Sequence, residues 1–152
     1  MRKSGEKPAK GNSAKYNSYC EAFTRIKSAQ EGGWYFEAVT LQESILCDRL
    51  QSHLIGIGIQ NIETSRSTVG SLLRAYKNSN CQTMSPELCQ QLSSWWTDRN
   101  RVVHQFAKSF PASATENVMD SLSHARQTAA NGDKLIRDVM KWYRDQVDGK
   151  SA

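Results

Sequence analysis

The sequence lacks any apolar run of the roughly 20 residues that a helix needs to cross a membrane. Polar residues follow Met1-Arg2-Lys3, so the apolar core of a secretory signal peptide is missing too. The four cysteines form no Cys-x-x-Cys pair, which argues against a zinc ribbon or a thioredoxin-type redox site. We therefore expect a cytoplasmic protein without a membrane partner, whose cysteines are reduced and mostly packed.

Phosphate-binding and metal-binding motifs are absent as well. Gly56 and Gly58 interrupt an isoleucine-rich segment, but no Gly-x-Gly-x-x-Gly or Gly-Lys-Ser/Thr follows them and no strand pattern precedes them. His53 and His124 have no partner at the spacing of metal ligands. We expect neither a cofactor nor a bound metal.

The basic charge of the chain is concentrated near its start. The 152 residues, enough for one domain, have a net charge of +5. Residues 1–15 contain five basic residues and one acidic residue, which leaves about +1 and no evident basic face for the rest. We expect residues 1–13 to be a disordered tail and residues 14–148 to form one domain. The tail is either a solubilising arm or a salt-sensitive contact for an anionic polymer.

Apolar residues recur at helical spacing along the domain, and no convincing strand alternation is present. We therefore expect an all-α bundle of about five helices. The expected helices cover residues 15–30, 34–54, 68–77, 86–110 and 115–147. Asn131-Gly132 could divide the last helix into two pieces.

The fourth of these helices carries a charged residue on its apolar side. Its apolar positions are Leu88, Leu92, Trp95, Trp96, Val102, Val103, Phe106 and Phe110. At roughly 100° per residue, Arg99 falls near the middle of this stripe, while Asn100 and His104 lie on its flank one turn apart. Because a buried arginine needs a partner, the pattern favours a functional site. A simple ion pair with a core carboxylate such as Glu43 or Asp48 is the alternative.

The Arg99-Asn100-x-x-x-His104 pattern resembles the Arg-x4-6-His signature of the HEPN superfamily, in which a polar residue, often Asn, follows the Arg. The helix expected at residues 34–54, with Glu37, Glu43 and Asp48 among its apolar positions, is similar to the second helix of a HEPN bundle. The resemblance covers most of residues 14–147 as helix order but only a few specific positions.

The resemblance implies a metal-independent endoribonuclease that leaves 2′,3′-cyclic phosphate ends. RNA supplies its own nucleophile, the 2′-hydroxyl. In this mechanism His104 transfers protons and Arg99 stabilises the charge that develops on the phosphate. Asn100 hydrogen-bonds either the phosphate or the imidazole.

The resemblance further implies a homodimer, in which the two motif helices meet and line one cleft. Arg99 and His104 diverge by roughly 140° on a single helix, so one copy makes a poor site and the apolar stripe would serve partly as the dimer surface. The implied partners are RNA and an antitoxin or regulatory protein, in a toxin–antitoxin or antiviral defence setting. Phe106 replaces the tyrosine that the antitoxin modifies in one branch of the superfamily, which excludes that modification here.

Two other classes of function stay open at this point. One is a non-catalytic HEPN-type module that binds RNA, a nucleotide or a protein partner. The other is an unrelated helical adaptor with a chance motif.

Overall fold

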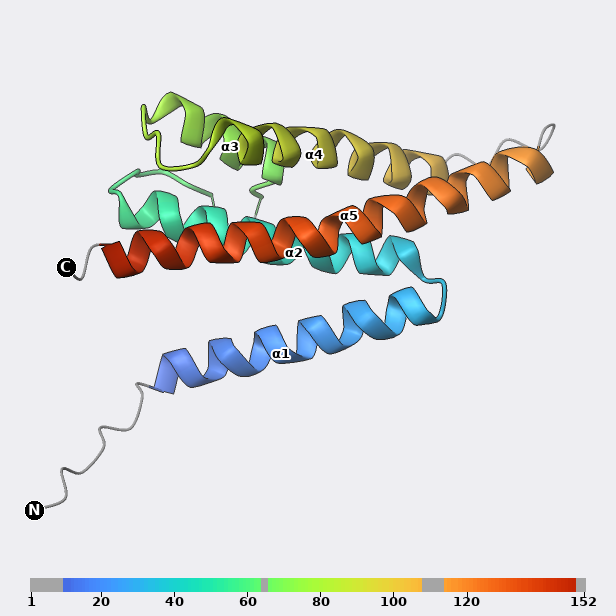
Figure 1. Cartoon of the computed structure of the whole chain (residues 1–152), viewed down its shortest axis with the longest axis horizontal. Helices are drawn as coiled ribbons and strands as arrows, with labels where there is room; N and C mark the ends of the chain where they lie inside the picture. Colours follow the sequence, from blue (N-terminus) through green and yellow to red (C-terminus); the bar gives the residue numbers. More distant parts are fainter. Residues whose placement is uncertain (1–9, 64–65, 108–113, 150–152) are drawn as a thin grey trace, which may run out of the picture.

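All regular structure in the described part of the chain is α-helical. The computed structural model describes residues 10–63, 66–107 and 114–149 (Figure 1). Its helices are α1 (Lys10–Glu31), α2 (Tyr35–Gly56), α3 (Val69–Asn78), α4 (Pro86–Ala107) and α5 (Ala114–Gly149). The expected all-α architecture of five helices is confirmed. None of the helices in these ranges combines the length and the apolar character that a membrane crossing requires.

The helix ends follow local sequence signals. Ser85 accepts a hydrogen bond from the Leu88 N–H (3.2 Å) and starts α4, with Pro86 in the first helical position. Thr68 and Ser71 form a reciprocal capping box at the start of α3. Gly33, at φ +77°, makes the turn between α1 and α2 in a conformation that favours glycine.

The first helix starts earlier than its apolar pattern indicates. α1 begins at Lys10, so residues 10–13, which we expected in the tail, are helical. The remainder of the expected disordered tail, residues 1–9, lies outside the described residues. The last expected turn of the fourth helix, residues 108–110, lies outside them too.

The bundle is built around α2 and α5, which run side by side through its centre (Figure 1). α4 packs mainly on α5, α3 bridges α2 and α4, and α1 lies along the other side of α2. The core contains the fully buried side chains of Val39, Leu46, Leu50, Leu54, Val69, Leu92, Val102 and Val139. Helices α2 to α5 thus each bury apolar side chains, as an amphipathic bundle requires, and α1 adds Ile26 and Ala29.

The last helix is continuous through Asn131-Gly132, so the expected division does not occur. Gly132 is buried against Gln42 of α2, and a Cβ at this position would collide with the Gln42 side-chain amide. That amide donates hydrogen bonds to the Ala129 carbonyl (2.7 Å) and to Asp133 (2.9 Å). The glycine therefore permits close packing of two helices rather than breaking one.

Candidate functional site

Arg99 lies on the inner side of α4 and forms an ion pair with Glu43 of α2. Its Nη2 atom is 2.5 Å from Glu43 Oε2, and the two side chains are only 21% and 13% exposed. The sequence placed Arg99 within the apolar stripe and named Glu43 as one of two candidate partners. Asp48, the other candidate, instead pairs with Lys15 and Arg49. The inward arginine is therefore neutralised within its own chain.

Two neighbours on α4 also hold the Arg99 guanidinium. Its Nη1 donates a hydrogen bond to Asn100 Oδ1 (3.1 Å), and its Cζ lies 5.1 Å from the centroid of the Trp96 ring. Trp96 is seated by Gly70 of α3, where a Cβ would come within 2.5 Å of the indole nitrogen. Glu43, Asn100 and Trp96 thus fix the Arg99 guanidinium, and Gly70 leaves room for Trp96. Arg99 Nε stays buried without a hydrogen-bond partner in the described residues.

Trp95 and Trp96 play different parts from one another. Trp95 is buried, and its Nε1 donates to the Thr128 carbonyl of α5 (3.1 Å). Trp96 is half-buried and packs at the edge of the core beside Arg99. Trp95 is therefore a core residue, and Trp96 lies partly in the core and partly at the surface.

His104 is exposed, one turn beyond Asn100 on the outer flank of α4. Asn100 is half-buried, so these two residues share a side of the helix, while Arg99 points roughly 140° away from His104. Arg99 and Asn100 are therefore in contact, and His104 is separate from Arg99 within one chain. A single copy presents the polar parts of the motif on two different faces.

The apolar stripe of α4 is occupied by the chain's own core. Leu92, Trp95 and Val102 are buried inside the bundle, whereas Val103 is half-buried. Val102 is therefore unavailable to a second copy, so it does not belong to the part of the stripe that could form a dimer surface. The side chains of Phe106 and Phe110 lie outside the described residues. The accessible face next to the motif is the one with Asn100, Val103 and His104.

Cys47 of α2 lies close to the Glu43–Arg99 pair, but its thiol is unreactive at neutral pH. Burial and the negative charge of Glu43 raise the pKa of its thiol to about 12, against the lowering effect of Arg99. At neutral pH Cys47 is a protonated thiol, and its Sγ is 3.8 Å from the Ser67 carbonyl, a weak hydrogen bond at most. It packs beside the site and offers no nucleophile.

A second cluster of charges ties α1 to the bundle. Asp48 accepts hydrogen bonds from the Tyr19 hydroxyl and from Arg49 (2.7 Å), and Lys15 lies 3.2 Å from it. The Arg49 guanidinium lies over the rings of Tyr19 (4.9 Å) and Tyr143 (4.4 Å). The cluster therefore links α1, α2 and α5, which is a structural role.

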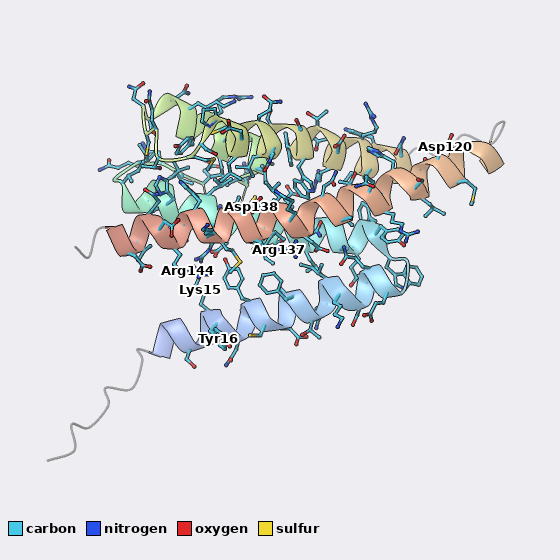
Figure 2. The ribbon with its side chains drawn as sticks, viewed as in Figure 1. Lys15, Tyr16, Asp120, Arg137, Asp138 and Arg144 are labelled. Atoms are coloured by element: carbon cyan, nitrogen blue, oxygen red, sulfur yellow. The ribbon has the colours of Figure 1, made fainter. Side chains whose placement is uncertain are left out.

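A row of cations lies on α5, although the sequence predicted no evident basic face in the domain. Arg126, Arg137, Lys141 and Arg144 fall within roughly 60° of arc on the exposed side of the helix. Figure 2 shows Arg137 and Arg144 projecting from the same side of α5, with Asp138 on the other. Within the described ranges none of the four has an ion-pair partner within 4 Å. We call them the α5 basic row. Its helical spacing was present in the sequence, but near-neutral overall charge obscured it.

Comparisons with models of protein families, with curated proteins and with solved structures found no match. Within residues 10–63, 66–107 and 114–149, no three side chains of His, Cys, Asp or Glu come together as a group that could hold a metal ion.

Proposed function

We propose that this chain is a metal-independent endoribonuclease of HEPN type, in which Arg99, Asn100 and His104 act on RNA. The observation that carries the proposal is the arrangement on α4. Arg99 is fixed by Glu43, Asn100 and Trp96, and the exposed His104 follows Asn100 by one turn. The proposal assigns proton transfer to the accessible imidazole, because an imidazole can both accept and donate a proton. It assigns phosphate recognition to the guanidinium edge and to the Asn100 amide.

The proposal includes a homodimer, because Arg99 and His104 face different directions on one helix. A two-fold axis along the face with Asn100, Val103 and His104 would bring the His104 of each copy toward the motif of the other. The half-buried Val103 supplies an apolar contact for this face. An antitoxin or regulatory protein would then act by covering the same face.

The α5 basic row supports RNA as the substrate. Its four cations lie on one side of a helix, and residues 126 to 144 span about 27 Å at 1.5 Å per residue. Unpaired cations on an exposed surface attract the phosphates of a single strand in a salt-dependent way. The row would hold RNA outside the cleavage site and carry no sequence information.

The second candidate is a non-catalytic module that binds RNA without cutting it. The Glu43–Arg99 ion pair favours it, since a guanidinium already neutralised by a carboxylate attracts phosphate less strongly. The two candidates differ in one readout, which is whether bound RNA is cleaved.

The test is an incubation of the purified protein with total RNA in excess EDTA. Cleavage should proceed and leave 2′,3′-cyclic phosphate ends. His104→Ala should lower the rate by about 10²-fold or more, as expected for the loss of a general acid or base. Gln105→Ala is the matched control, because Gln105 is the exposed neighbour on the same helix. Binding without cleavage would favour the module, and cleavage that needs a divalent ion would refute the mechanism.

A further inference from the structure

Cys81 and His53 form a pair that is separate from the α4 motif. The Cys81 Sγ lies 3.7 Å from the His53 Nε2, although the two residues come from the loop after α3 and from α2. The Thr83 hydroxyl lies 3.4 Å from the same sulfur. An imidazole nitrogen and a hydroxyl therefore converge on one thiol, as they do at cysteines that act as nucleophiles.

The imidazole of this pair is held rigidly. His53 is only 5% exposed, and its ring lies 4.5 Å from the Trp142 ring and 5.9 Å from the Tyr76 ring. Aromatic faces stabilise a cationic ring, and a thiolate beside it compensates the charge that burial would otherwise disfavour. The surroundings thus suit a thiolate–imidazolium pair.

The loop that carries Cys81 is anchored on both sides of the thiol. The Cys81 N–H donates to the Ser79 hydroxyl (3.3 Å), and the Met84 N–H donates to the Tyr76 hydroxyl (2.8 Å). The backbone passes through a left-handed conformation at Asn80 (φ 56°). These contacts hold the sulfur in place against α2, so the short distance to His53 does not depend on a loose loop.

A pocket of about 470 Å³ borders Cys81, the thiol of the pair. Its lining contains no Asp or Glu in the described part of the chain. The lining residues are Tyr76, Lys77, Asn80, Cys81, Gln82, Met84, Pro86 and Cys89. Lys77 adds a positive charge, and Cys81 itself is half-buried. Reactive cysteines occur in such electropositive, partly accessible surroundings.

We propose that Cys81 is a nucleophilic thiol activated by His53, and that the pocket admits small hydroperoxides that oxidise it. The Cys81 thiolate attacks one peroxide oxygen, so an S–O bond forms while the O–O bond breaks. The leaving alkoxide, or hydroxide in the case of hydrogen peroxide, takes the proton that His53 accepted from the thiol and departs as an alcohol or as water. Sulfur loses two electrons to the peroxide, and the product is a sulfenic acid. This site is independent of the ribonuclease proposal.

The other three cysteines provide internal standards for the proposal. Cys20 is exposed on α1 and has unhindered access to reagents. Burial and Glu43 raise the pKa of the Cys47 thiol to about 12, so it should not react. Burial also raises the pKa of Cys89, which borders the same pocket as Cys81. If exposure alone set the rate of oxidation, Cys20 would react fastest. If activation by His53 sets it, Cys81 reacts fastest.

The experiment treats the reduced full-length protein with hydrogen peroxide and dimedone at pH 7 and quantifies the adduct at each cysteine by peptide mass spectrometry. An ordinary thiol is only a few per cent thiolate at this pH, so Cys81 should be labelled on the order of tenfold faster than Cys20. The same measurement in Cys89→Ser prevents Cys89 from consuming the sulfenic acid first. Labelling of Cys81 no faster than that of Cys20 in both proteins would overturn the proposal.

Variants separate activation by His53 from simple accessibility. His53→Asn should reduce labelling of Cys81 to the level of Cys20 or below, with labelling of Cys20 unchanged. Because His53 is buried, this variant could fail to fold, and Thr83→Val then serves as the second test at an exposed position. It removes the hydroxyl beside the sulfur and should slow Cys81 several-fold. Unchanged Cys81 rates in the folded variants would also overturn the proposal.

Discussion

Arg99 on α4 and Glu43 on α2 lie 2.5 Å apart, so the one inward-facing cation of the candidate site is matched by an acid from another helix. The pair has two consequences. It fixes the direction of the guanidinium, and it reduces the charge that a phosphate would meet. Glu43 is therefore a positioning residue in the proposed mechanism, and its effect on stability and on activity can be measured separately.

Breaking the Arg99–Glu43 pair should destabilise the fold. Arg99→Ala leaves the carboxylate of Glu43 largely buried, and we expect a loss of about 2–3 kcal/mol in the free energy of unfolding. This is less than for a fully buried pair because Arg99 keeps some exposure to solvent. The double variant with Glu43→Ala should lose less than the sum of the single losses, as measured by urea denaturation. The exposed Arg25–Glu21 pair is the control, with an expected coupling clearly smaller than that of Arg99 and Glu43. Equal coupling in the two cycles would contradict the role of burial.

Two adjacent valines should respond differently to the same change. Val102→Asp places a carboxylate in the core and should unfold the protein, because Val102 is fully buried. Val103→Asp should leave a folded chain and, in the proposed dimer, separate the two copies and abolish cleavage together. Light scattering and circular dichroism on both variants provide the measurement. A parent protein that is monomeric at micromolar concentration and still cuts RNA would exclude the shared site.

Removing cations from the α5 basic row should weaken RNA binding more than it alters cleavage of bound RNA. The triple variant Arg137→Ala, Lys141→Ala, Arg144→Ala removes three phosphate contacts. We expect the slope of log K against log[salt] to become less steep by about 2. A control that also removes three exposed cations is Arg25→Ala, Arg66→Ala, Arg74→Ala. Fluorescence anisotropy with a labelled single strand gives the slopes. The same slope in both triple variants would show that overall charge, rather than the row, attracts RNA.

Acid should weaken the attachment of α1 through Asp48. Burial alone would raise the pKa of this carboxyl, but hydrogen bonds from Tyr19, Arg49 and Lys15 hold it below its ordinary value. A carboxylate with a lowered folded-state pKa stabilises the fold above about pH 4, and this contribution is lost as the pH falls through the lower value. Asp48→Asn should thus cost about 1 kcal/mol at pH 7, a small effect because solvent screens the group. Urea denaturation at pH 7 and pH 3 should show the difference between parent and variant shrinking in acid; a constant difference would refute this account.

Expression of an unrestrained ribonuclease should arrest the growth of a bacterial host. His104→Ala should relieve the arrest without lowering the thermal stability, since the imidazole is exposed. Arg99→Lys keeps a charge for Glu43 and is a better companion than Arg99→Ala, which loses stability. Growth curves with matched protein levels provide the readout. Variants as toxic as the parent would place the active residues elsewhere.

The helices were predictable because each has a stripe of apolar residues and clear boundary residues. Ser85-Pro86 lies at the start of α4, and Gly33 follows the end of α1. The start of α1 was misplaced because residues 10–13 carry no apolar stripe, so nothing in the periodicity extends the helix to Lys10. Asn131-Gly132 suggested a break because intrinsic propensity disfavours glycine, and tertiary packing overrides that preference.

The candidate site was predictable along one helix and not between helices. Periodicity predicted Arg99 within the apolar stripe. It could not decide whether Glu43 or Asp48 is the ion-pair partner, because the periodicity of a single helix does not determine how two helices are rotated relative to each other. The same limit hid the pairing of Cys81 with His53, which a loop and a different helix bring together. Periodicity also could not show that Val102, within the stripe expected to serve partly as a dimer surface, is buried inside the bundle.

Gly132 has a consequence for the far end of the molecule. At this position the backbone of α5 lies directly against Gln42, and this close contact favours the observed axial register of α5 along α2. Tyr143 follows Gly132 by about 16 Å along the helix, and that interval places its ring over Arg49. Trp142, beside it, is brought to His53. The absence of a Cβ at Gly132 therefore helps to position α5 along α2. A Gly132→Ala change should disturb the distant aromatic contacts as well as its own surroundings.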